Sequence, residues 1–148
     1  SDKQAMIRAA VAAVRDCADT MEGQATSLLQ SLPTVAISEE LRSNALELTE
    51  GLKDASGRVT FELALLQAEL ADGKAEAATA VKRLLAMDAT MMAAVAALTD
   101  FVDQLEEAAE RDERYESAFV LVIEATGVLL QALEKARVAT ESLGAVTP

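Results

Sequence analysis

The stretch that decides the fold is "IRAAVAAVRDCADTMEGQATSLLQSL", residues 7–32. Its apolar residues recur in alternating steps of four and three positions, which places them along one side of an α-helix, in the manner of a coiled coil. Pro33 follows at once, and because proline disfavours helical geometry in the residue before it, the helix is predicted to end at Leu32. We call such a stripe a seam, and this one contains Ile7, Val11, Val14, Ala18, Met21, Ala25, Leu28 and Leu32.

A second helix with the same spacing is predicted after the loop. Ser38 is a suitable N-cap residue, and the two glutamates at 39–40 favour the positive end of a helix dipole. The seam then contains one additional step of four, from Val59 to Leu63, which locally unwinds a supercoil. Asp-Gly at 72–73 is a turn signal and is predicted to end this helix.

Two more seams follow, and only the charged segment "ERDER" at 110–114 lies between them as a break. Unbroken, they predict one helix of about seventy residues, about 100 Å long, with half of its seam lacking a partner in the same chain. A break near Arg111 instead gives four helices of similar length. We therefore predict an all-α, elongated up-down-up-down four-helix bundle with coiled-coil-like seams, in which residues 1–148 form a single domain. The expected helices span about 3–32, 38–71, 74–110 and 113–143, and the single long helix remains the alternative.

The charge of the chain restricts its partners. Thirteen basic and 25 acidic residues give a net charge of −12, which repels the phosphates of nucleic acids and the surfaces of anionic membranes. The lone cysteine, Cys17, cannot form an internal disulfide and suits a reducing compartment, so we predict a cytoplasmic location. Because the chain starts at Ser1 without a methionine, we expect it to be a fragment of a longer protein.

The sequence also lacks the residues that most helical-bundle chemistry requires. There is no histidine, which excludes Glu-x-x-His di-iron sites, phosphohistidine transfer and histidine-ligated haem. No nucleophile motif or phosphate-binding glycine loop is present, so we predict no enzyme activity and no cofactor. The carboxylates at 106–116 are predicted to form a solvated, salt-bridged helix end. Two acids stand in apolar surroundings, Glu124 and, less strongly, Asp88, and Glu124 is expected to face outward.

The most apolar segment is "SAFVLVIEATGVLLQAL", residues 117–133. Asp88 and Glu124 interrupt the longest apolar stretches, so we predict that this region does not insert into a membrane. The apolar arc is nevertheless wider than one helix contact requires, and it predicts either contact with two neighbouring helices or a groove open to a partner. The candidate partner surface consists of Leu121, Ile123, Val128, Leu130, Met91 and Met92.

Two functions remain open at this point. The first is a non-enzymatic helical bundle that acts through protein contacts, as a scaffold, an adaptor or a self-associating segment. The second is the ligand-binding four-helix sensor domain of a membrane receptor. Sparse aromatic residues and the few basic residues expected near a pocket weigh against the second, so a small-molecule ligand is not expected.

Overall fold

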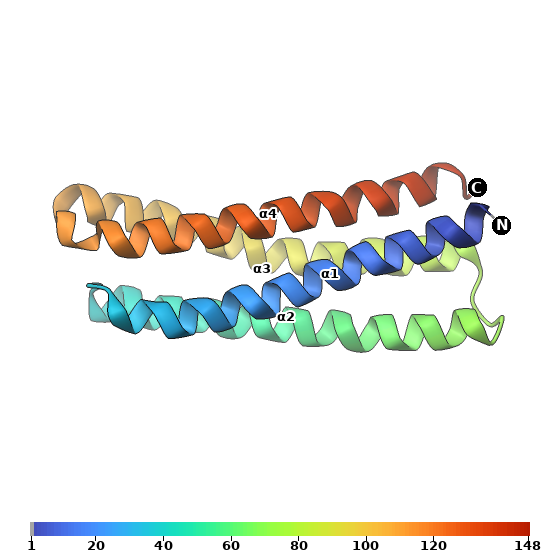
Figure 1. Cartoon of the computed structure of the whole chain (residues 1–148), viewed down its shortest axis with the longest axis horizontal. Coiled ribbons are helices and arrows are strands. Elements are labelled where there is room, and N and C mark those ends of the chain that lie inside the picture. The colour runs from blue at the N-terminus through green and yellow to red at the C-terminus, as the bar shows by residue number, and fades with distance from the viewer. Residues whose placement is uncertain (1) are drawn as a thin grey trace.

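The computed structural model describes residues 2–148, and within them the chain forms four long α-helices and no strand. The helices run alternately up and down along the long axis of an elongated bundle (Figure 1). The predicted four-helix bundle is therefore confirmed. The helices are α1 (Asp2–Ser31), α2 (Glu39–Ala71), α3 (Ala77–Arg111) and α4 (Glu116–Ala145).

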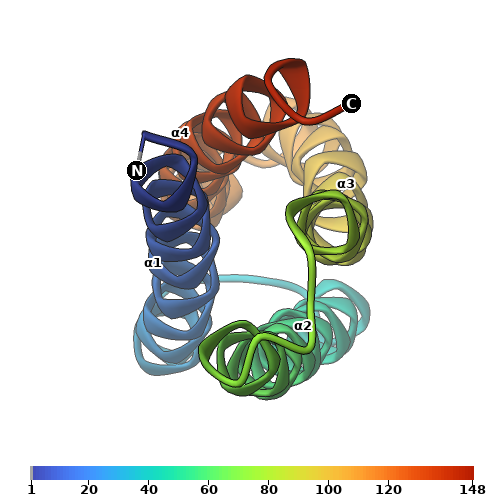
Figure 2. The ribbon, with the colours of Figure 1, turned by 90° about the vertical axis from the view of Figure 1, so that its right-hand side faces the viewer.

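The helices follow one another around the bundle in chain order. Each packs on the next, and α4 closes the ring against α1 (Figure 2). Of the two diagonal pairs, α1 and α3 approach more closely than α2 and α4. Each helix therefore has two long neighbours within the chain.

Several helix ends match the local signals in the sequence. α3 and α4 each begin three residues after the predicted start, because residues 74–76 still belong to the turn and Glu113–Tyr115 form a 3-10 turn. Leu32–Thr34 forms a short 3-10 turn that contains Pro33, and the Ser38 hydroxyl then accepts a hydrogen bond of 3.3 Å from the Leu41 N–H. At the next connection Gly73 has φ of +69°, in the left-handed region that favours glycine.

The third and fourth helices are separate, as the length argument predicts. α3 ends at Arg111, and Asp112 has an extended backbone with φ −147° and ψ 107°. Its side chain accepts a hydrogen bond of 3.1 Å from the Arg114 N–H and caps the short 3-10 turn Glu113–Tyr115. This capped corner reverses the chain and starts α4.

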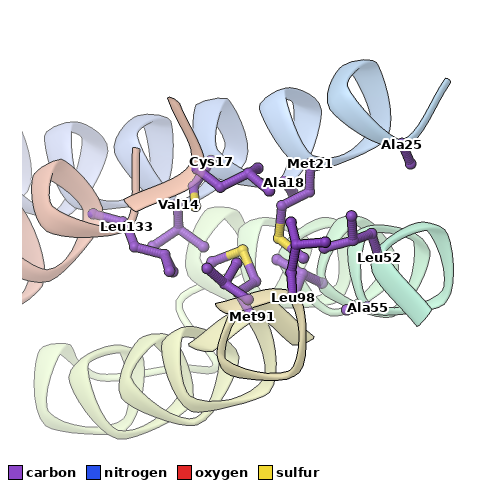
Figure 3. Packing of buried hydrophobic residues seen from close by; sticks show 14 of the residues in the cluster. Val14, Cys17, Ala18, Met21, Ala25, Leu52, Ala55, Met91, Leu98 and Leu133 are labelled. Atoms are coloured by element: carbon purple, nitrogen blue, oxygen red, sulfur yellow. The ribbon is translucent and has the colours of Figure 1, made fainter. Parts of the chain in front are cut away.

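The seams form the core. All positions of the first seam from Val11 to Leu32 are buried, and Figure 3 shows Met21, Leu52, Met91 and Leu98 pointing into the space between the helices. Alanines on the seams let the backbones approach closely. At one such contact the Ser56 hydroxyl of α2 donates a buried hydrogen bond of 2.7 Å to the carbonyl oxygen of Ala18 on α1.

Candidate functional site

The acidic cluster at 106–116 lies at the corner between α3 and α4. Within it Arg114 Nη2 lies 2.7 Å from Asp112 Oδ2, and hydrogen bonds from Arg114 hold the pKa of Asp112 below its usual value. Glu124 faces outward, as predicted, and is exposed. Among the described residues, no three His, Cys, Asp or Glu side chains are grouped so that they could hold a metal ion.

Asp88 is the acid that the bundle buries. Only 8% of Asp88 is exposed, and its Oδ1 has no hydrogen-bond partner in the part of the chain that the structure describes. Oδ2 lies 3.8 Å from Arg137 Nε of α4. Burial raises the pKa of Asp88, and the neighbouring Arg137 offsets this only in part. Across the core, burial and the charge of Asp88 raise the pKa of Cys17 to about 12.

This buried carboxyl predicts a pH-dependent contribution to stability. Because the pKa of Asp88 is higher in the folded chain than in the unfolded chain, folding favours the protonated form. Its stabilising contribution is fully present below the unfolded pKa and is lost as the pH rises through the folded pKa. Arg137, Glu134 and Glu141 of α4 and Cys17 of α1 are the charged or titratable groups that act on it or are acted on by it.

We therefore expect Asp88→Asn to stabilise the bundle at neutral pH, with an advantage over wild type that shrinks as the pH falls toward 4. Urea unfolding of both proteins at several pH values measures this difference, while the other carboxylates titrate alike in both. An advantage that stays constant over this range would show that the charge of Asp88 costs nothing when it is buried.

The six residues of the predicted partner surface do not lie together on one face of the bundle. Met91 is fully buried in the core and belongs to no surface, which corrects its assignment from the sequence. On α4, Leu121 and Val128 lie on one flank and Ile123 and Leu130 on the other, because residues seven apart share a side of a helix. Met92 lies beside the core and is half-buried.

A second, outward-facing seam lies on α3. Between Arg83 and Asp100 the only charged residue is the buried Asp88, so this part of the helix presents no charge to solvent. Its outer positions again follow steps of four and three, and apart from the half-buried Met92 they are exposed. They are Leu85, Ala89, Met92, Ala96 and Thr99.

The fourth helix carries a matching outward seam. Its members are spaced in steps of three and four, and all of them are exposed. They are Val120, Ile123, Gly127 and Leu130.

The ion pair between Asp88 and Arg137 shows how these two seams lie relative to each other. It marks the side of α4 that meets α3, and Leu130 lies on that side, two turns before Arg137. Since the helices are antiparallel, Leu130 is level with residues two turns after Asp88, near Ala96. The two seams therefore form one diagonal apolar stripe across α3 and α4, here called the outer stripe. Past Leu130 on α4 it ends at charged residues, beginning with Glu134.

A cavity opens at the other side of the molecule, between α1, the end of α2 and the following loop. Its volume is about 690 Å³. Near these residues the N-terminal half of α1 runs away from α2 and toward α4 (Figures 1 and 2). Its lining residues are Gln4, Ile7, Arg8, Val11, Ala12, Arg15, Gln67, Leu70, Ala71, Gly73, Ala75 and Ala77.

Two helical stretches, Ala77–Arg111 and Glu113–Ala145, are long and apolar enough to cross a membrane by length and composition alone. Asp88 and Glu124 therefore do not make these stretches too polar to span a membrane. In the bundle, 39% and 33% of the residues in their most apolar windows are buried, and these residues form the inner seams. The composition of these helices is thus partly accounted for by the core.

Comparison of the chain with protein-family models, with curated proteins and with solved structures found no significant match.

Proposed function

We propose that this chain is a non-enzymatic protein-interaction bundle that self-associates through the outer stripe of α3 and α4. The outward seam of α3 supports this function most directly. A solvated helix normally presents charged residues on its outer face, yet the outer positions from Leu85 to Thr99 carry none in a chain with net charge −12.

Among the surfaces that two copies could share, the outer stripe is opposed least by charge repulsion. Two copies repel each other over most of their surfaces, because the charges are predominantly negative. Contact through the outer stripe brings together uncharged side chains instead. Its small residues, such as Ala89 and Ala96, allow two helices to approach closely, while Leu85 and Leu130 provide apolar area at a two-fold contact.

The outer face of α2 is the competing surface, and it is less suitable. Phe61 is 66% exposed there and Leu65 lies one turn after it. However, Asp54, Arg58 and Glu62 lie in the same region, so contact there would require charged groups to be desolvated. This face therefore provides a matched control.

The test is a charge-neutral double substitution in the outer stripe. Leu85 and Leu130 are both 45% exposed, so Leu85→Lys with Leu130→Glu should leave the helicity unchanged. Because four leucines per dimer are removed from the contact, we expect the association constant to fall at least about a hundredfold. Sedimentation of each protein over a range of concentrations measures this.

The control carries the same substitutions on α2. Leu46 and Leu65 are both 46% exposed, so Leu46→Lys with Leu65→Glu makes an equivalent change at equivalent exposure. We expect this variant to associate as wild type does. A monomeric wild type, or an equal loss of association in both variants, would contradict the proposed function.

A further inference from the structure

The cavity beside the N-terminal half of α1 differs from the rest of the surface in its charge. Both of its charged lining residues, Arg8 and Arg15, are basic, although the protein has almost twice as many acidic as basic residues. They are seven positions apart on α1 and therefore lie on the same side of the helix, about 10 Å apart along its axis. This spacing lets both long side chains reach a group placed between them.

Neither arginine is held by a carboxylate of the described residues. Arg15 Nη2 donates a hydrogen bond to the amide oxygen of Gln67 on α2, which is neutral. Because a guanidinium has five N–H donors, Arg15 keeps donors for a second acceptor while this bond holds its side chain across the cavity.

The rest of the lining is mainly apolar. Ile7, Val11 and Leu70 provide branched side chains, and the remaining positions are largely alanines that are too small to fill the space between the diverging helices. A volume of about 690 Å³ is within the range of about 300–1,000 Å³ that is typical of small-molecule sites. The cavity therefore suits a ligand with an apolar body and an anionic end.

We propose that this cavity binds an amphipathic carboxylate, with its carboxylate between Arg8 and Arg15 and its apolar body against Ile7, Val11 and Leu70. The positive charge of the two arginines favours an anion, and the apolar lining favours an alkyl or aromatic body over a compact inorganic ion. This site lies away from the outer stripe, so it adds a ligand to the bundle whether or not the chain self-associates.

Decanoate is the probe, and calorimetric titration below its micelle-forming concentration is the measurement. We expect saturable binding by the wild-type chain, and binding of decanol, which has the same chain length and no charge, that is at least about tenfold weaker. Arg8→Gln and Arg15→Gln should each weaken decanoate binding about tenfold, because each removes a charged donor. Ala12→Trp, at an exposed lining position, should fill the cavity and abolish binding.

Arg58→Gln is the matched control, because Arg58 is an exposed arginine of α2 that does not line the cavity. It should bind decanoate as wild type does, and circular dichroism of every variant should match that of wild type. Absence of saturable decanoate binding, equal affinity for decanol, or an equal effect of Arg58→Gln and Arg8→Gln would each overturn the proposal.

Discussion

Ala18→Asp is expected to destabilise the bundle by about 3–5 kcal/mol, which is a large part of the stability of a typical domain. Ala18 is fully buried on the seam of α1, and its carbonyl oxygen accepts the hydrogen bond from Ser56 on α2. A carboxylate at this position would be buried without a partner and would also hold α1 and α2 apart. Urea unfolding followed by circular dichroism measures the loss.

The same substitution at two other alanines tests how the loss of stability depends on burial, because the added charge is the same in each case. Ala94 of α3 packs against the core but is only half-buried, so Ala94→Asp should cost less than Ala18→Asp. Ala9 is exposed on α1, and Ala9→Asp should change stability by less than about 0.5 kcal/mol. If Ala9→Asp proved as damaging as Ala18→Asp, the register of α1 would be wrong.

Replacing three helical glycines by alanine is expected to stabilise the bundle by about 2–3 kcal/mol in total. Gly23, Gly51 and Gly57 lie within α1 or α2 and are exposed, and a Cβ built at each would have nothing within 4 Å. Alanine therefore reduces the conformational freedom of the unfolded chain without a clash in the folded chain. For a domain of this size the midpoint of thermal unfolding should rise by about 5–10 °C.

The same substitution at Gly73 is expected to destabilise the bundle. No atom would crowd its Cβ either, but its φ of +69° strains any residue that has a side chain. Gly73→Ala is therefore expected to lower stability by about 1 kcal/mol. A stabilising Gly73→Ala would contradict the geometry of the turn between α2 and α3.

The fold could be predicted because one physical signal repeats along the whole chain. Apolar residues in steps of three and four define a buried side wherever they occur, and Pro33, the Asp-Gly turn at 72–73 and the charged segment 110–114 separate the helices. The break after Arg111 required a second consideration, since only a reversal of the chain there gives the last seam a partner.

The partner surface was predicted less well than the fold. A wide apolar arc on a helix does not show which of its residues face a neighbouring helix and which face solvent. Met91 and Met92 are adjacent in sequence, yet only Met91 lies in the core. The three-and-four spacing of the outward seam from Leu85 to Thr99 on α3 is present in the sequence. It lies in the same apolar run as the inner seam, so the two cannot be separated without the structure. Relating them to Leu130 on α4 required the pairing of Asp88 with Arg137.

The buried acid and the cavity depend on packing between segments that are distant in sequence. Asp88 lies beside the α3 seam, and the closeness of α4 decides that it is buried. Arg8 and Arg15 follow seam positions of α1 and are exposed, as their positions on the helix predict. Only the divergence of α1 from α2 creates the space beside them.

Self-association through the outer stripe is tested most directly by distances between copies that carry one spin label each. Ala93 is exposed at the edge of the outer stripe, and Asp54 is exposed on the outer face of α2. Cys17 needs no replacement, because it is buried and its pKa is raised to about 12, so the label reacts at the introduced cysteine. With one label per chain, any dipolar coupling arises between copies.

Contact through the outer stripe should place labels at position 93 within about 30 Å of each other, and labels at position 54 about 40 Å or more apart, since each helix layer is about 10 Å thick. Pulsed electron paramagnetic resonance measures both distances. The predicted result is a short distance from Ala93→Cys and a longer one from Asp54→Cys. A shorter distance from Asp54→Cys, or no coupling between copies at either site, would contradict self-association through α3 and α4.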